Sequence, residues 1–259
     1  MGKLDGKVVI ITGCSSGLGK QQAIRLAEEG AKLAICSRTE SRLMETKKLC
    51  EESGAEVFAM ALDIMSYDDL VTFVDKTVER FGTIDVLVNN AHTVTNPGPF
   101  LEKPIEDLDT EMHSSVYAYW HLMKLCYPYL KDKPGAGSSI INFASEAAVA
   151  GLESFAPYAA SKEAVRGLSR VVAREWGQFN IRVNTLCPNG LTDNCQMGFD
   201  HLEPDVREWA ENAFTDNPFK RAGDPYHDVA PIVVFFASDD SRWITGQNIH
   251  ADGGTLINA

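Results

Sequence analysis

Tyr158 and Lys162 stand four residues apart and could move a proton. A free phenol has a pKa of about 10, so a tyrosine works as an acid or base near neutral pH only where a cation stabilises the phenolate. Residues at positions i and i+4 share one face of a helix, which would bring the lysine ammonium close to the tyrosine ring. The pair therefore predicts a proton-transfer site.

The chain contains a second pair with the same spacing, Tyr127 and Lys131, and Ser114 precedes it by thirteen residues. Ser114 and Tyr127 fall within one predicted helix, residues 109–130. At about 1.5 Å of rise per residue they stand roughly 20 Å apart, too far to share a substrate oxygen. This second set is therefore excluded as a site.

Ser145 is the serine that can join Tyr158. It follows a predicted strand, and the loop 146–156 can return the chain so that Tyr158, on the next helix, meets it at the carboxyl edge of the sheet, where ligands of α/β proteins bind. The alternative is a serine in a turn beside an exposed helical pair.

A glycine-rich turn, Thr12-Gly13-Cys14-Ser15-Ser16-Gly17-Leu18-Gly19, lies between the first predicted strand and the first predicted helix. Glycines permit a tight turn there and let the backbone approach a pyrophosphate, which rests on the helix N-terminus. The turn lacks the Gly-Lys-Ser/Thr of an ATP-binding loop, so a dinucleotide is favoured over ATP. The alternative is a turn without a ligand.

Short apolar runs alternate with longer segments of helical period, which predicts βαβ units and a parallel sheet covered on both faces. Strands are expected at 8–12, 32–36, 57–63, 84–89, 139–143, 181–186 and 248–251. Helices are expected at 19–29, 42–53, 67–81, 109–130 and 157–179. Because no linker or repeat divides the chain, residues 1–259 are expected to form one α/β domain, a Rossmann-type doubly wound sheet of about seven strands.

Composition is that of a globular protein, with 44% hydrophobic and 23% charged residues among 259. The formal charge of −12 repels phosphate backbones and anionic surfaces, so neither nucleic acid nor a membrane is expected as a partner. Six cysteines without a Cys-x-x-Cys pair, and no long apolar stretch near the start, favour a reducing, cytoplasmic location.

Residues 189–223 show no clear period. Apolar side chains stand there among acids and prolines: Met197, Phe199, Leu202, Trp209, Phe214 and Phe219. Long insertions after a sheet strand often cover a pocket, so a substrate lid is expected. The alternative is a small helical pair on the edge of the domain.

Taken in order, the motifs resemble those of the short-chain dehydrogenase/reductase family in its Tyr-x-x-x-Lys form. After the glycine turn come Asp63, Asn89-Asn90-Ala91, Ser145, Tyr158-Ala-Ala-Ser-Lys162, Ile181-Arg-Val-Asn184, Pro188, and Thr245-Gly-Gln near Asp252-Gly-Gly254. The resemblance covers nearly the whole chain. It implies an NAD(P)-dependent alcohol dehydrogenase or carbonyl reductase that forms a homotetramer or homodimer.

The resemblance also implies roles for individual residues. Ser145 would orient the substrate oxygen, Tyr158 would exchange the proton, and Lys162 would lower the pKa of the tyrosine and hold the nicotinamide ribose. Asp63 would hydrogen-bond the adenine. The cofactor is expected on Gly13, Ser15, Ser16, Gly17, Leu18, Gly19, Ser37, Arg38, Asp63, Ile64, Asn90, Ala91, Tyr158, Lys162 and Pro188. The substrate is expected on His92, Ser145 and Tyr158.

The end of the second predicted strand bears on the choice of dinucleotide. NAD enzymes usually place a carboxylate there for the ribose 2′-OH, whereas a 2′-phosphate needs a cation and is repelled by a carboxylate. This chain has Ser37 and Arg38, which favours NADP(H) over NAD(H). The family's second basic residue, inside the glycine turn, is replaced by Ser15 and Ser16. The alternative is an exposed Arg38 paired with Glu40 or another acid.

Two positions near the expected site depart from the family pattern. His92 stands where glycine commonly follows Asn-Asn-Ala, so its side chain either contacts the substrate or is accommodated by a shifted loop. The family's catalytic asparagine, which supports a water in the proton relay, falls on Ser115. Either this hydroxyl suffices, a neighbour such as Ser114 or His113 contributes, or the match is displaced by one residue.

A further departure follows the sixth predicted strand, where the family's Pro-Gly and downstream Thr read Pro188-Asn189 and Asp193. No role is assigned to this acid. The other histidines, at 113, 121, 201, 227 and 250, lack ligand-like spacing with cysteines or acids, so no metal is expected.

The leading hypothesis is an NADP(H)-dependent oxidoreductase of secondary alcohols and ketones. An apolar, bulky substrate, steroid-like or cyclic, is expected because apolar residues come from segments around the mouth of the site: Val94, Phe100, Leu152, Phe155, Met197, Phe199 and Trp209. Two alternatives remain. A 3-oxoacyl-carrier-protein reductase would need a basic docking patch, which the charge of −12 disfavours. A weakly catalytic NADP(H)-binding sensor or structural protein would explain the departures, although the intact Ser145, Tyr158 and Lys162 count against it.

Overall fold

The molecule is built around one parallel sheet. The structure, a computed structural model, describes residues 2–200 and 204–257. The strand order of the sheet is β3-β2-β1-β4-β5-β6-β7. The strands are β1 (Val8–Thr12), β2 (Lys32–Ser37), β3 (Val57–Ala61), β4 (Val86–Asn89), β5 (Ser138–Phe143), β6 (Ile181–Pro188) and β7 (Asn248–Ala251). The predicted doubly wound sheet of seven strands is confirmed.

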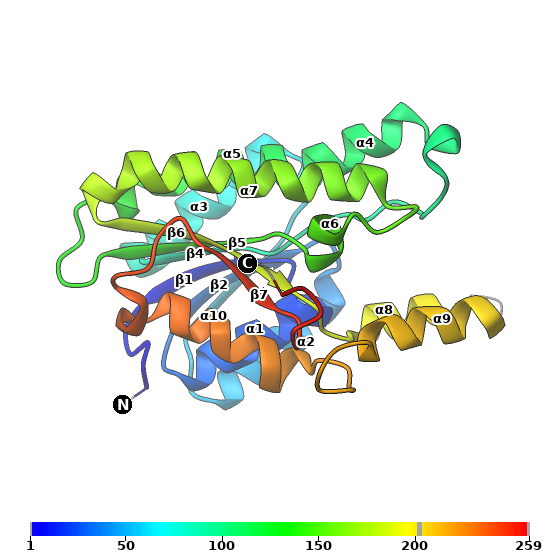
Figure 1. The fold of residues 1–259 in the computed structure, drawn as a ribbon. Coiled ribbons are helices and arrows are strands. Elements are labelled where there is room, and N and C mark those ends of the chain that lie inside the picture. Colours follow the sequence, from blue (N-terminus) through cyan, green and yellow to red (C-terminus); the bar gives the residue numbers. More distant parts are fainter. Residues whose placement is uncertain (1, 201–203, 258–259) are drawn as a thin grey trace.

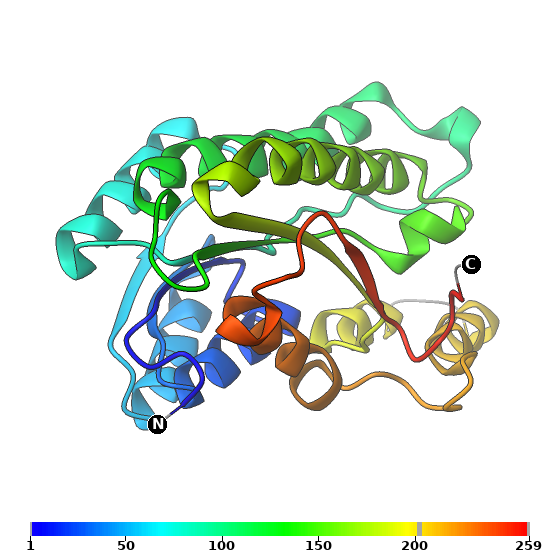
Figure 2. The same cartoon turned by 60° about the vertical axis from the view of Figure 1, so that its left-hand side comes forward.

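The central strands are buried because both faces of the sheet are covered. All five residues of β1 and all six of β5 are buried. Helices α1 (Gly17–Glu28), α2 (Glu40–Glu52) and α10 (Ala230–Ala237) cover one face, and α3 (Tyr67–Phe81), α5 (Ala118–Leu130) and α7 (Ala156–Trp176) cover the other (Figures 1 and 2). Each layer has its own hydrophobic cluster.

Local signals set the ends of α3, which the sequence predicts residue for residue. The Ser66 side chain accepts a hydrogen bond from the Asp69 N–H, and Gly82 ends the helix in the left-handed region with φ 79°. Leu70, Phe73 and Val74 recur at helical spacing and pack against the sheet.

The predicted helix 109–130 is one continuous rod of three pieces. These are α4 (Ile105–Met112), a π-helical turn η2 (His113–Tyr117) and α5. The next predicted helix is observed as α7 followed by a 3-10 turn, η3 (Gly177–Phe179). Every third or fourth residue of α7 is buried, and this buried stripe includes Ser161, Lys162 and Val165. The helix therefore turns Lys162 toward the sheet.

Segments that the sequence leaves as loops contain short helices. The loop after β5 begins with α6 (Glu146–Ala150), and the interval 189–223 contains α8 (Asp193–Phe199) and α9 (Pro204–Thr215). Figure 1 draws α8 and α9 at the end of the molecule where α6 also lies. Of the apolar residues named for this interval, Leu202 and the side chain of Trp209 lie outside the described residues.

Before α10 the chain makes a π-helical turn, η4 (Pro225–Val229), and neither element was expected from the sequence. The α10 segment is almost wholly apolar, so its pattern lacks the polar face by which a helix is recognised. Two 3-10 turns, η1 (Phe100–Glu102) and η5 (Asp239–Ser241), complete the described elements. No helix within 2–200 or 204–257 is long and apolar enough to cross a membrane.

Candidate active site

The parallel strands end at one edge of the sheet, and the chain reverses its direction of winding between β1 and β4. Ligands of such sheets bind at this switch point because the loops on its two sides diverge. The loops after β1, β4 and β5 carry the glycine turn, His92 and Ser145 respectively. The candidate site is therefore built from segments far apart in the sequence.

The proton-transfer residues predicted from the sequence lie together. Lys162 is buried, its Nζ donates a 3.0 Å hydrogen bond to the carbonyl of Phe143, and it lies 5.8 Å from the centroid of the Tyr158 ring. The side chain of Ser145, which precedes α6, hydrogen-bonds the tyrosine. A serine hydroxyl, a phenol and an ammonium thus lie together, an arrangement that can orient a substrate oxygen and exchange its proton.

Burial governs the ionisation of this group. Desolvation raises the pKa of Tyr158 to about 12, and the hydrogen bond with Ser145 acts in the opposite direction. Desolvation also lowers the pKa of Lys162 to about 8. Burial of the phenolate thus dominates the pKa of Tyr158. That the charge of Lys162 lowers this pKa stays a prediction of the family resemblance.

The second tyrosine of the sequence analysis is structural. The Tyr127 ring lies 4.8 Å from the ring of Trp176 and 5.6 Å from that of Phe179, between α5 and the end of α7. Ser114 lies in the π-helical turn at the other end of α5. The exclusion of this set is confirmed.

The glycine turn packs directly against the loop after β4. A Cβ on Gly19 would lie 2.2 Å from the Gly13 carbonyl oxygen and 2.6 Å from Nδ2 of Asn90, so no larger residue fits there. Thr12 joins the two loops, since its hydroxyl accepts hydrogen bonds from the N–H groups of Asn90 and Ala91 at 3.1 and 3.0 Å. The glycine turn and the loop after β4 are therefore packed and hydrogen-bonded together.

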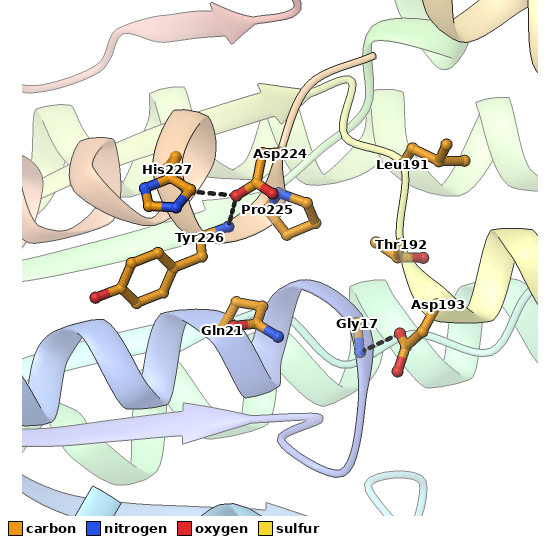
Figure 3. A pocket seen from close by; sticks show the side chains of 9 residues that line it. All are labelled: Gly17, Gln21, Leu191, Thr192, Asp193, Asp224, Pro225, Tyr226 and His227. Carbon is orange, nitrogen blue, oxygen red and sulfur yellow. Dashed lines mark hydrogen bonds between the residues drawn. The ribbon is translucent and has the colours of Figure 1, made fainter. Parts of the chain in front are cut away.

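The N-terminus of α1 binds a carboxylate oxygen. The Gly17 N–H donates a 2.8 Å hydrogen bond to Asp193, the first residue of α8 (Figure 3). Asn194 donates one of 3.0 Å to the Ser16 hydroxyl. The Asp193 carboxylate stands in for an anionic ligand such as a phosphate. The turn thus fits the phosphates of a dinucleotide, because the N–H at its helix N-terminus already donates to an anionic oxygen.

A pocket of about 370 Å³ lies beside this contact. Gly17 and Gln21 of α1 form one side, the 191–193 segment a second, and the Asp224–His227 turn the third (Figure 3). Asp224 holds that turn by accepting hydrogen bonds from the N–H groups of Tyr226 and His227. The pocket thus lies next to the hydrogen bond that joins Gly17 of the glycine turn to Asp193.

The other residues expected to hold the cofactor also lie along this edge. Ser37 ends β2 and is buried, and Arg38 beyond it is exposed. Within 2–200 and 204–257, no ion pair joins Arg38 to Glu40 or to another acid. Asp63 accepts a hydrogen bond from the Met65 N–H after β3. The other members of the set are Ser15, Leu18 and Ile64 near the first three strands and Pro188 at the end of β6.

His92 points into the protein rather than out of a displaced loop. Its side chain is 7% exposed, its Nε2 hydrogen-bonds Glu111 of α4, and its ring meets that of Tyr158 edge to face at 5.3 Å. Ser115 is buried in the π-helical turn, where its hydroxyl donates a 2.8 Å hydrogen bond to the Glu111 carbonyl. Ser114 accepts a hydrogen bond from the Thr93 N–H.

Sequence reasoning missed Glu111 and Tyr119. Glu111 stands four residues before Ser115 and Tyr119 four residues after it, so all three lie on the same buried face of the helix. An acid at helical spacing on a buried face was the signal that the sequence offered. The Tyr119 hydroxyl donates to the Ala91 carbonyl, and its ring lies 5.7 Å from Lys162 Nζ. Both residues pack behind the candidate proton-transfer group.

Only some of the apolar residues named for the substrate lie against the tyrosine. Phe155 does, with its ring 6.2 Å from that of Tyr158. Leu152 lies in the same turn after α6. Val94, Phe100 and Met197 are exposed, whereas Phe199 packs against Phe214 of α9 at 5.9 Å. No group of three metal-binding side chains occurs in the described part of the chain.

Fold and site together define a class, the dinucleotide-dependent oxidoreductases with a doubly wound sheet and a tyrosine at the proton-transfer position. A family model described as enoyl-(acyl carrier protein) reductase matches residues 13–255. The chain belongs to the short-chain dehydrogenase/reductase family and is an alcohol/ketone oxidoreductase of the kind that binds NAD(P)(H).

Similar proteins cover nearly the whole chain. A 12α-hydroxysteroid dehydrogenase of Clostridium sp. is 37% identical, with 98% of each chain aligned. A 3-oxoacyl-[acyl-carrier-protein] reductase of Thermotoga maritima is 33% identical over 98% of this chain and 100% of its own. The structure of levodione reductase has a TM-score of 0.91 at 30% identity, covering 97% of this chain and 98% of its own.

A solved 7α-hydroxysteroid dehydrogenase, in complex with NADH and 7-oxo glycochenodeoxycholic acid, is also similar. It has a TM-score of 0.87 at 31% identity and covers 97% of this chain and 94% of its own. The similar proteins thus include several hydroxysteroid dehydrogenases.

Proposed function

We propose that this protein is an NADP(H)-dependent oxidoreductase that interconverts a secondary alcohol and a ketone on a bulky, apolar substrate of steroid-like or cyclic shape. The placement of Lys162 against the ring of Tyr158, with Ser145 hydrogen-bonded to that tyrosine, carries the proposal. When bound, the dinucleotide accepts or donates the hydride. Tyr158 takes or returns the hydroxyl proton, and Ser145 orients the oxygen.

The surroundings of Tyr158 support an apolar substrate. Phe155, the residue before α7, contacts the Tyr158 ring, and His92 meets the same ring from the loop after β4. These side chains leave an aromatic rim with one imidazole, which suits a large ring system that carries few polar groups. The similarity to hydroxysteroid dehydrogenases agrees with this class. Segment 189–223 is proposed as the lid, since α8 begins at the glycine turn.

An acyl group on a carrier protein is the second candidate substrate, because one similar protein is named a 3-oxoacyl-[acyl-carrier-protein] reductase. The formal charge of −12 disfavours docking of an acidic carrier, so the small ketone is preferred.

The preference for NADP(H) rests on Arg38. It is exposed just after β2 and forms no ion pair with an acid within the described residues, so its guanidinium could bind a 2′-phosphate. The position where NAD enzymes usually carry an acid is a serine here, Ser37, which does not repel that phosphate. The similar 7α-hydroxysteroid dehydrogenase holds NADH, so both cofactors belong in the test.

Assembly and location are also proposed. Large apolar side chains are exposed on the outer helices, with Tyr117 and Trp120 at and after the π-helical turn and Val171 on α7. They favour a homotetramer or homodimer, which sedimentation can test. All six cysteines are free thiols, which suits the reducing cytoplasm.

The test is cofactor consumption against a panel of ketones from small aliphatic to steroidal, with NADPH and NADH in parallel. Loss of turnover by about 10²-fold or more in Tyr158→Phe, with NADPH still bound, is the expected result. Tyr127→Phe is the matched control, because that tyrosine occupies the same local motif outside the site. NADPH binding without Tyr158-dependent turnover across the panel would favour the sensor alternative.

A further inference from the structure

The buried carboxylate of Glu111 has no counterpart among the residues assigned above. It is 1% exposed and accepts hydrogen bonds from the Thr95 N–H at 2.7 Å and the Thr95 hydroxyl at 3.0 Å, besides its bond with Nε2 of His92. A buried carboxylate is costly unless such donors satisfy it. These three hydrogen bonds, from His92 and from the two groups of Thr95, therefore stabilise a carboxylate at this buried position.

The Glu111 carboxylate decides which nitrogen of His92 carries the proton. An ionised carboxylate only accepts hydrogen bonds, so Nε2 must be protonated, which leaves Nδ1 as an acceptor in the neutral ring. Nδ1 is buried and has no hydrogen-bond partner within the described residues. Desolvation and the charge of Lys162 lower the pKa of His92 to about 4, which keeps the ring neutral.

The pair also lies against the proton-transfer group. The His92 ring contacts Tyr158, and the charge of Glu111 raises the pKa of both Tyr158 and Lys162. Each neighbouring element contributes titratable or charged groups to this cluster. They are His92 and Lys103 in the loop after β4, Asp107 and Glu111 of α4, Tyr119 of α5, Tyr158 and Lys162 of α7, Cys187 of β6 and Cys195 of α8.

Two of these groups, Lys103 and Asp107, form an ion pair with each other. The carboxylate whose charge acts on both Tyr158 and Lys162 is that of Glu111.

We propose that Glu111 is a positioning residue of the reaction: it fixes His92 in the Nε2-protonated form against the ring of Tyr158 and places a negative charge beside the tyrosine and Lys162. The proposal rests on the proposed function, since it concerns how that site holds its proton. Glu111 acts on the reaction through these three side chains.

The experiment uses Glu111→Gln, which removes the negative charge of the side chain and keeps its shape. A glutamine still accepts from Thr95, but its amide can pair with either form of His92 and carries no charge. In alcohol oxidation Tyr158 must be deprotonated, so removal of the negative charge should move the limb of the kcat/KM profile that rises with pH toward lower pH. Glu163→Gln is the control, because that acid neighbours Lys162 in sequence but pairs with Arg166 at the surface.

A second measurement does not depend on turnover. Nitrogen-15 NMR of histidine-labelled wild-type protein, with His92→Gln to assign the signal, should show His92 neutral and protonated on Nε2 between pH 5 and 8. Glu111→Gln should relax this preference. A profile for Glu111→Gln that superimposes on wild type, or a His92 protonated on Nδ1 in wild type, would overturn the proposal.

The two measurements separate this inference from the proposed function. If no ketone in the panel is turned over by wild type, the proposed function fails, and the NMR tautomer still decides the role of Glu111. If Glu111→Gln does not fold, the wild-type tautomer remains decisive.

Discussion

The main-chain N–H of Gly17 donates a 2.8 Å hydrogen bond to the carboxylate of Asp193. This contact ties the N-terminus of α1 to the first turn of α8, and the bond from Asn194 to Ser16 reinforces it. The sequence alone indicates no role for Asp193. The structure shows it at the position where a helix N-terminus favours a phosphate oxygen.

Replacement of this carboxylate should strengthen cofactor binding. In Asp193→Ala we expect NADPH to bind several-fold more tightly, because the Gly17 N–H is released and a negative charge is removed from the path of the phosphates. Titration of NADPH fluorescence measures the affinity. Asp216→Ala, which removes an exposed acid after α9, should leave it unchanged. Equal or weaker binding by Asp193→Ala would show that the contact does not compete with the cofactor.

Arg38 should decide between the two dinucleotides. In Arg38→Glu we expect the KM for NADPH to rise by about tenfold or more while the KM for NADH changes little, because a carboxylate repels the 2′-phosphate and suits a 2′-hydroxyl. Lys48→Glu makes the same charge change farther along α2 and serves as the control. Equal effects on both cofactors would contradict the assignment of NADP(H).

Ser115 replaces the asparagine that the family resemblance leads one to expect. We predict that Ser115→Ala lowers turnover several-fold without weakening NADPH binding, because the variant loses the hydroxyl that bonds the Glu111 carbonyl within the π-helical turn. Steady-state kinetics and NADPH titration test both halves, with Thr72→Ala as the control, because that hydroxyl also bonds the carbonyl four residues before it but lies on α3. An unchanged rate would remove Ser115 from the mechanism.

The burial of Lys162 makes stability depend on pH. Its pKa is lowered from 10.5 to about 8, so between these values the unfolded chain holds a proton that the folded protein has released. The free energy of unfolding from this group therefore rises with pH across that window. Relative to Lys162→Met, wild type should gain on the order of 1–2 kcal/mol between pH 7 and 9.5, as measured by urea unfolding. Lys131→Met, at an exposed lysine, should show no such difference, and a flat wild-type difference would contradict the lowered pKa.

Short-range patterns in the sequence predicted much of the fold. Buried parallel strands are seen as continuous apolar runs, and Ser66 and Gly82 are residue types typical of the two ends of a helix such as α3. The short helices α6, α8 and α10 were missed because their segments are brief or lack a polar face. Rise per residue alone was enough to reject Ser114 with Tyr127, since both belong to one rod.

By itself the sequence determined the class of site, because the glycine turn and the motifs around Tyr158 and Lys162 are local features of a strand, a turn and a helix, and helix geometry was enough to set aside the same spacing at Tyr127 and Lys131. The tertiary structure decided how that site is surrounded. Glu111 meets His92, and Asp193 meets Gly17, only after α4 and α8 fold back over the edge of the sheet. Contacts between segments so distant along the chain leave no periodic signal in it, since each depends on where whole elements pack.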